Sequence, residues 1–359
     1  MPDQSGQKHY VREWGFAMRK LFLMLAVAAL VATMSTNATA ASTSAGSTGT
    51  GAVFVPNPVQ SLGDESLTDQ KDSDSAVPAA AYSNVTLTNL DGSGYLRGTW
   101  AIVKSETGTP AFGGAGCTFN YTRHQDQFEQ VMAYYWVTEA QKYIQSLGFG
   151  GRLRPINNRS QAVRINQLGY DNSFATDHPK NELRFGKGGV DDAEDAEVIL
   201  HEYGHAIHFA QNFSFASEQA GAISEGFGDY WAVTVGDVVS KALGVPALEP
   251  LACVADWDAV SYTSTVPHCL RRVDQNLHFP ADLSGEVHHD GQIWSRALWD
   301  IRQALGNVRA DTIILQGSFD FPGTTMTDLA NRTVAAARQL YGRAAATVVT
   351  KAFTDRGIL

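Results

Sequence analysis

Residue types suited to metal chemistry stand close together in one short segment, His201-Glu202-Tyr203-Gly204-His205. Four residues advance a helix by slightly more than one turn, so both imidazoles lie on one helix face and can share one cation. Imidazole and carboxylate ligands suit zinc, and a catalytic zinc site keeps one coordination position open. Glu202 can reach a water molecule in that position. The pattern therefore predicts a zinc site that activates water.

Acidic side chains follow at a matching distance. Glu225 comes twenty residues after His205, and a second helix can bring it beside the histidines as the third zinc ligand. Asp229, one turn later on the same face, can accept the other N–H of a ligand imidazole and fix its tautomer. The alternative for both acids is a solvated helix face. His208 lies about 10 Å along the axis from His201, so we expect it to be a packing or surface residue.

Hydrophobic periodicity predicts the elements that must position these residues, and it indicates an α+β fold in which a mixed β/α region precedes a mainly helical one. The region from 41 to 116 is predicted to hold a flexible Ser/Thr/Gly tail at 41–51, an acidic solvated loop at 64–74 and a small β-rich part. Helices are expected at 128–147, 192–211, 219–243, 289–305, 325–341 and 343–356, and strands at 85–88, 99–103, 163–165 and 182–185.

The first forty residues have the features of a secretory signal peptide. Arg19 and Lys20 precede an apolar run that ends at Met34, and Ala38-Thr39-Ala40 supplies the small residues of a cleavage site. Met18 is an alternative start. An uncleaved membrane anchor is disfavoured because the run is shorter than the roughly 20 residues of a spanning helix. We therefore expect residues 1–40 to be removed and the mature protein to be secreted, without a membrane contact.

Composition excludes several classes of protein. With 37 acidic and 27 basic residues in 359, the net charge of −10 argues against nucleic acid as a partner. A hydrophobic share of 44% is enough for a sizeable core. Three cysteines cannot staple a chain of this length. Cys253 and Cys269 could close a loop, which leaves Cys117 over, or Cys117 could pair with either of them.

The quoted motifs resemble those of the Glu-zincin metallopeptidases, the clan of thermolysin and fungalysin. The step from His205 to Glu225 is similar to that of thermolysin, whereas Glu225-Gly226-Phe227-Gly228-Asp229-Tyr230 is nearer to fungalysin-like bacterial members. The resemblance implies a thermolysin-like two-lobe fold, with a β/α lobe at 117–211 that ends in the zinc helix and a helical lobe at 212–359. It also implies one catalytic zinc ion, Glu202 as general base, protein or peptide substrates and a monomer.

Two more segments resemble functional parts of this clan. Gly285 to Gly291, followed by Trp294 and Leu298-Trp299, is similar to the segment that supplies a catalytic histidine, and its Val-His frame selects His288 over His289. Asp282 is a candidate acidic partner for His288. Ala216 stands where thermolysin has a tyrosine, so stabilisation of the oxyanion must come from elsewhere.

Substrate-binding residues also follow from the resemblance. Asn172-Ser173-Phe174-Ala175 is similar to the edge strand that pairs with the substrate backbone, which implicates Asn172 and Phe174. Arg271 or Arg272 could bind a substrate carbonyl.

A cluster of acidic residues lies at the predicted start of the zinc helix. They have two interpretations, namely favourable charge at a helix N-terminus on a solvated face, or a calcium site. The residues are Asp191, Asp192, Glu194, Asp195 and Glu197.

Together these features predict a secreted zinc metalloendopeptidase. Two alternatives remain: a non-catalytic secreted binding protein that keeps the zincin fold, and a zinc exopeptidase. A binding protein has no need of Glu202 or His288, and an exopeptidase would need an acidic cluster that binds a substrate amine.

Overall fold

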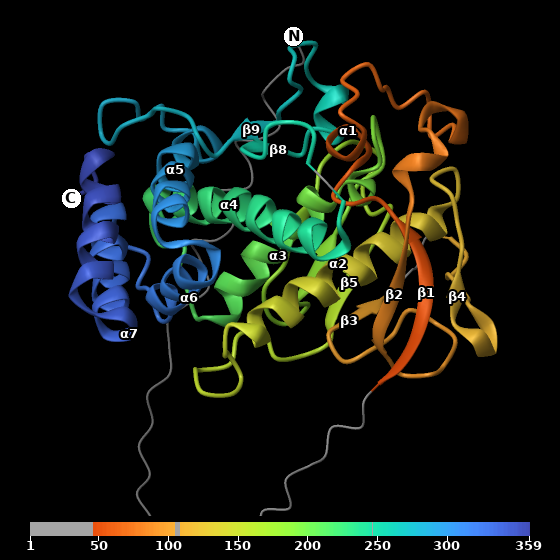
Figure 1. Cartoon of the computed structure of the whole chain (residues 1–359), viewed down its shortest axis with the longest axis horizontal. Coiled ribbons are helices and arrows are strands. Elements are labelled where there is room, and N and C mark those ends of the chain that lie inside the picture. The colour runs from red at the N-terminus through yellow and green to blue at the C-terminus, as the bar shows by residue number, and fades with distance from the viewer. Residues whose placement is uncertain (1–45, 105–107, 246) are drawn as a thin grey trace, which may run out of the picture. The chain divides into compact units, whose positions relative to one another are not determined.

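The computed structural model describes residues 46–104, 108–245 and 247–359, which form an α+β fold of three small sheets and seven α-helices (Figure 1). The predicted α+β class is confirmed. The described residues cluster as one compact unit. The predicted signal peptide at 1–40 and the alternative start at Met18 lie outside the described residues.

Each sheet joins segments that are distant in the sequence. The strand orders are β2-β1-β4, β3-β5-β7-β6 and β8-β9. In the second sheet β3, β5 and β7 run parallel, and β6 pairs antiparallel with β7 at the edge. The strands are β1 Ser47–Val53, β2 Ser83–Leu90, β3 Ala101–Val103, β4 Thr118–Phe119, β5 Gln161–Arg164, β6 Phe174–Ala175, β7 Glu182–Arg184, β8 Cys253–Val254 and β9 Arg271–Arg272.

The predicted flexible tail at 41–51 is wrong from Ser47 on, because these residues form the central strand β1 of the first sheet. Two glycines allow β1 to lie this close to the neighbouring segments. A Cβ at Gly49 would lie 2.3 Å from the Cys117 carbonyl oxygen, and one at Gly51 would lie 2.8 Å from a methyl carbon of Val131. A composition typical of a linker is therefore also what a strand needs when it packs tightly between its neighbours.

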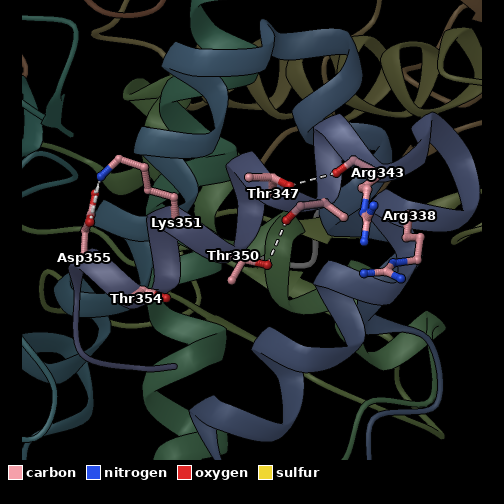
Figure 2. Close-up of a pocket in the computed structure, with 8 residues that line it drawn as sticks. Arg338, Arg343, Thr347, Thr350, Lys351, Thr354 and Asp355 are labelled. Atoms are coloured by element: carbon pink, nitrogen blue, oxygen red, sulfur yellow. Dashed lines mark hydrogen bonds and ion pairs between the residues drawn. The ribbon is translucent and has the colours of Figure 1, made fainter.

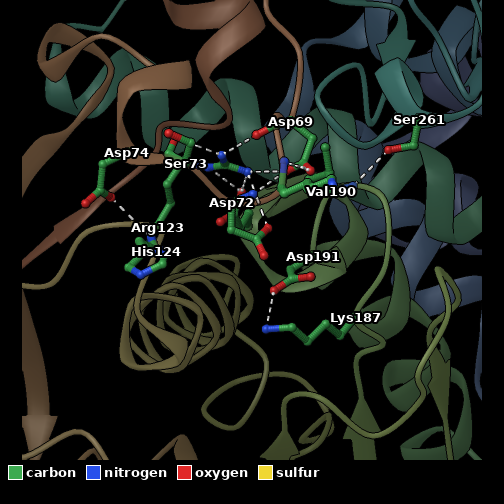
Figure 3. Close-up of polar contacts among 12 residues, drawn as sticks. Asp69, Asp72, Ser73, Asp74, Arg123, His124, Lys187, Val190, Asp191 and Ser261 are labelled. Carbon is green, nitrogen blue, oxygen red and sulfur yellow. Dashed lines mark hydrogen bonds and ion pairs between the residues drawn. The ribbon is translucent and has the colours of Figure 1, made fainter.

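The predicted solvated loop at 64–74 is a loop whose residues are exposed or half-buried, apart from Leu67, but the buried guanidinium of Arg123 ties it to the core. Arg123 donates to the backbone carbonyl of Asp69 at 2.8 Å, to its carboxylate at 2.6 Å and to the carbonyl of Ser73 at 3.2 Å. It also donates two hydrogen bonds to the buried Glu194 carboxylate, at 3.0 and 2.8 Å. Figure 3 shows Asp69 and Ser73 beside Arg123. A buried guanidinium needs several acceptors, and this loop supplies them.

The helices agree closely with their predicted ranges. The expected helix at 192–211 begins as a 3-10 turn, Asp192–Glu194, before α3. The expected break between the last two helices occurs at Gly342, where α7 has a φ of 80°. The short helices α1 and α6 were not predicted. The helices are α1 Pro58–Leu62, α2 Asp126–Ser146, α3 Ala196–Ala210, α4 Glu218–Leu243, α5 Val287–Leu305, α6 Asn307–Ser318 and α7 Met326–Asp355.

None of the described helices combines the length and the apolar character needed to cross a membrane.

Helix α4 packs against α3 on one side and α5 on another, and glycines line both contacts. A Cβ at Gly204 of α3 would lie 3.0 Å from the Gly228 Cα of α4, and a Cβ at Gly226 of α4 would lie 2.1 Å from the Gly291 carbonyl oxygen of α5. The backbones therefore approach more closely than side chains would allow. Residues next to these glycines on all three helices converge as a result.

Candidate metal centre and active site

Three predicted ligands meet where α3 crosses α4. His201 Nε2 lies 3.2 Å from Glu225 Oε2, and His205 Nε2 lies 3.6 Å from Glu225 Oε1. Two atoms bound at about 2.1 Å to one tetrahedral zinc ion are about 3.4 Å apart. The three side chains therefore have the spacing of a shared metal ion. They form one of the two groups among the described residues that could hold one.

The second ring nitrogen of each histidine has its own partner. His201 Nδ1 lies 2.8 Å from Asp229 Oδ1, as predicted for that acid, and His205 Nδ1 lies 2.8 Å from Ser224 Oγ. When Nδ1–H donates to these oxygens, the Nε2 lone pair faces Glu225 and is available to a cation. Two imidazole nitrogens and a carboxylate oxygen are a donor set that fits zinc.

The charges of the site also favour a cation. Burial disfavours the charged form of both imidazoles. For His205 it is the largest cause and lowers the pKa to about 4. For His201, the contacts with Asp229 and Glu225 outweigh burial and raise the pKa to about 10. The two carboxylates thus create a negative potential beside His201, where a proton or a metal ion would be stabilised.

Asp229 is itself held by Arg271, which donates from Nε and Nη2 to both carboxylate oxygens at 2.7 Å. Burial would raise the pKa of Asp229, but the Arg271 charge and hydrogen bonds hold it well below its usual range. Arg271 lies on β9, next to a loop closed by the Cys253–Cys269 disulfide. This geometry makes Arg271 a positioning residue, and its contact with a substrate carbonyl stays a prediction. Arg272 pairs with a nearby aspartate instead.

The free cysteine is Cys117, which is buried. Of the pairings that the sequence left open, the structure therefore has the one between Cys253 and Cys269.

Glu202 is buried beside the ligands on α3, and its Oε2 has no hydrogen-bond partner among the described residues. Burial is the largest cause that raises the pKa of Glu202, to about 7. A carboxyl group with an ordinary pKa near 4 would be a weaker base at neutral pH. The environment of Glu202 therefore suits a group that takes up and releases a proton.

His288 faces the same cluster from the start of α5, with Nε2 3.4 Å from Glu225 Oε2. Its Nδ1 lies 2.6 Å from Glu286 Oε1. Glu286 also caps α5, because its carboxylate accepts the backbone N–H groups of His288 and His289 at 3.0 and 2.8 Å. His289 turns instead toward Asp290, with its Nδ1 3.2 Å from that carboxylate.

The candidate partner Asp282 is therefore wrong for His288. Asp282 accepts the backbone N–H of His278 at 2.7 Å, whereas Glu286 sits two residues before His288 and is fixed by the helix cap. The sequence did contain a signal for Glu286, namely an acidic residue three positions before a predicted helix, where negative charge is favourable.

His208 is a packing residue, as predicted. It is fully buried, with its ring stacked 4.1 Å from Phe213 and 4.4 Å from Phe227. Its Nδ1 lies 3.0 Å from the same Ser224 hydroxyl that contacts His205. Ser224 thus joins a ligand to a packing histidine, a link that the sequence analysis missed.

The predicted substrate-binding residues lie at the edge of the second sheet. Phe174 begins β6, the last strand in the order, and pairs with Arg184 of β7. Asn172 is exposed just before it. Because β6 also packs against the zinc helix α3, an added strand would run beside the site. Their contact with substrate stays a prediction.

The carboxylates before α3 are buried, so their predicted solvated face is wrong. Asp195 caps α3 and lies within 3.5 Å of the Asn57 amide nitrogen. Glu197 accepts from the Ala255 N–H at 2.7 Å and from the Gln60 side chain at 3.2 Å. Segments distant in the sequence thus cover these acids, and the segment around α1, which supplies Asn57 and Gln60, supports the start of the zinc helix.

A pocket of 380 Å³ lies on the surface of α7, and none of the candidate site residues lines it (Figure 2). Threonines and charged side chains line it, and Lys351 pairs with Asp355 one turn away. None of its lining residues is a histidine or a cysteine.

Among solved structures, the precursor of protealysin, a metalloproteinase from Serratia proteamaculans, is similar to this chain. The identity is 18% and the TM-score 0.49, over 64% of this chain and 79% of that chain. No protein-family model and no curated protein matches the chain. The geometry of the site itself therefore carries the functional assignment.

Replacing Gly228 by alanine should damage the metal centre, because the added Cβ would lie 2.7 Å from His201 Nδ1. We expect Gly228→Ala to lower the free energy of unfolding by about 1–3 kcal/mol and to weaken zinc binding. Thermal unfolding and zinc titration measure both effects. Gly236→Ala is the matched control in the same helix, since its nearest neighbour is 3.6 Å away. Equal zinc affinity in the two variants would contradict the close fit around His201.

Proposed function

We propose that this chain is a secreted zinc metalloendopeptidase, a Glu-zincin nearer to fungalysin-like bacterial members with a thermolysin-like arrangement of two lobes around one cleft. The observation that carries the proposal is the approach of the His201 and His205 Nε2 atoms to the two Glu225 oxygens, at 3.2 and 3.6 Å, while both Nδ1 atoms have other partners. This donor set would hold one zinc ion with an open coordination position.

Zinc bound there would act as a Lewis acid on the scissile carbonyl and lower the pKa of its water. Glu202 takes the proton of the attacking water and later passes it to the leaving amine. Its burial and its unpartnered Oε2 suit both steps. His288 points Nε2 toward the cluster and donates to the developing oxyanion, while Glu286 orients its ring through Nδ1.

Asp229 and Arg271 hold the ligand geometry. The Asp229 carboxylate accepts from the His201 ring and from Arg271, so the orientation of the imidazole is set by two contacts rather than one. Such partners of a metal ligand raise its basicity and reduce the freedom of its ring.

Secretion is supported by the signal-peptide pattern in residues 1–40 and by the disulfide between Cys253 and Cys269, a bond typical of oxidising compartments. The substrates would be proteins or peptides, bound as an added strand along β6 through Asn172 and Phe174, and the enzyme would act as a monomer.

Replacing Glu202 tests the proposed chemistry. We expect wild-type protein to bind zinc and to cleave casein at internal positions, with activity lost in the presence of a chelator. Glu202→Gln should keep zinc and lower the rate by a factor of about 10² or more, because the proton acceptor is gone. Glu218→Gln, at an exposed position on α4, is the control.

The outcomes separate the alternatives. Zinc binding without hydrolysis in the wild type would indicate a binding protein, and cleavage confined to chain ends would indicate an exopeptidase. Undiminished hydrolysis by Glu202→Gln would contradict the assignment of Glu202 as the general base.

Two adjacent histidines provide a matched test of oxyanion stabilisation. His288→Ala should lower kcat by a factor of about 10²–10³, as removal of one oxyanion donor does elsewhere, with a smaller change in KM. His289→Ala should remain close to wild type because His289 faces Asp290. Steady-state kinetics on one peptide substrate measures both variants, and a larger loss for His289→Ala would reverse the assignment.

A further inference from the structure

The hydroxyl of Ser224 on α4 lies between two imidazoles of α3. Its Oγ is 2.8 Å from Nδ1 of the candidate zinc ligand His205 and 3.0 Å from Nδ1 of His208. Ser224 and His208 are fully buried, so bulk water does not compete for their contact. One hydroxyl therefore connects the candidate metal centre to a histidine outside it.

The direction of the first hydrogen bond follows from zinc binding, and this step rests on the proposed function. When His205 binds zinc through Nε2, its proton is on Nδ1, so the ring donates to Ser224 Oγ. A serine hydroxyl has one proton and two lone pairs. The proton of Ser224 is therefore free for a second contact, and His208 Nδ1 is the acceptor within reach.

His208 accepts this proton only when its own Nδ1 carries none. Burial is the largest cause that holds the pKa of His208 well below its usual range, so the ring is neutral. Its Nε2 has no hydrogen-bond partner among the described residues. With the ring proton on Nε2, one buried N–H is unpaired. With the ring proton on Nδ1, both the Ser224 proton and the Nε2 lone pair would be unpaired, which is the more costly arrangement.

Packing accounts for the position of the His208 ring but not for its chemistry. The ring stacks on Phe213 at 4.1 Å and on Phe227 at 4.4 Å between centroids. A phenylalanine would make the same kind of contact without burying an unpaired nitrogen, which is costly. The contact of His208 Nδ1 with Ser224 is what a phenylalanine could not provide.

We propose that His208 is a positioning residue of the metal centre, and that it acts through Ser224 to hold His205 in the tautomer that binds zinc. A hydroxyl that donates one hydrogen bond is a stronger acceptor for another. The contact with His208 therefore strengthens the bond from His205 Nδ1–H to Ser224 Oγ. This bond in turn fixes the ring and raises the basicity of its Nε2.

The two candidate zinc histidines thus differ in their support. His201 contacts the charged Asp229, which Arg271 holds, whereas His205 contacts a chain of two neutral groups. Neutral support is useful beside Glu225, whose Oε1 lies 3.6 Å from His205 Nε2 and attracts a proton to that nitrogen when no metal is bound. The Ser224–His208 chain opposes this by holding the proton on Nδ1, without adding a charge to the site.

A double-mutant cycle in the full-length protein tests whether His208 acts through Ser224. His208→Phe keeps an aromatic ring at this position but cannot accept a hydrogen bond. We expect it to lower zinc affinity, measured by competition with a chromophoric chelator, by a factor of about 10 or more. In the Ser224→Ala background the same substitution should cause no further loss, because the connecting hydroxyl is gone. His124→Phe, at an exposed position, is the matched control and should bind zinc like the wild type.

Nitrogen-15 spectra of the histidine-labelled, metal-free protein give a second readout that a packing role would not change. We expect the proton of His208 on Nε2 in the wild type, and a smaller fraction of His205 rings with the proton on Nδ1 in His208→Phe. A wild-type His208 with its proton on Nδ1 would overturn the proposal.

The outcomes of the cycle separate this proposal from the proposed function. Wild-type zinc affinity in His208→Phe, or an equal loss in both backgrounds, would overturn the role of His208 while the metal centre stands. A wild-type protein that binds no zinc would overturn the metal centre, and the role of His208 with it.

Discussion

The close approach of α4 to two other helices is the constraint on which the site depends. Gly228 lets α4 touch Gly204 of α3, and Gly226 lets it touch Gly291 of α5. Glu225 lies beside Gly226, so the same contacts that bring the helices together deliver its carboxylate to the histidines. With side chains at these positions the helices would separate, and ligand atoms now 3.2 to 3.6 Å apart could no longer share one ion.

Around this crossing, polar contacts set the orientation of the histidine rings. Asp229 and Ser224 occupy the Nδ1 atoms of the two ligand histidines, and Arg271 holds Asp229 from β9. Glu286 does two tasks at once, because it caps α5 and orients His288. Segments that precede the zinc helix by more than a hundred residues supply donors to the acids beneath it, as Gln60 does for Glu197. The support of the site is thus spread over the chain, although its ligands come from two helices.

The features that could be predicted from the sequence depend on residues close together in the chain. The helical period placed α3, α4 and α5 within a few residues, and the spacing of His201, His205 and Glu225 indicated one metal centre because each ligand sits on a predicted helix. The position of His208 followed from helix geometry alone.

What could not be predicted depended on contacts between distant segments. The segment at 47–51 is a central strand that pairs with β2 and β4, and Cys117 and Val131 pack against its glycines. The acids before α3 looked solvated because nothing nearby in the sequence shows that Arg123, Asn57 and Gln60 cover them. Local charge density indicates a polar surface, and only the fold shows where such a surface is buried.

The central claim is that His201, His205 and Glu225 bind one catalytic zinc ion, and diffraction from crystals of the zinc-loaded protein at the zinc absorption edge tests it most directly. The account predicts a single strong anomalous peak bonded to both Nε2 atoms and to a Glu225 oxygen, at about 2.0–2.2 Å. A structure in which these three side chains contact each other without a metal peak between them, or in which zinc binds elsewhere, would contradict it.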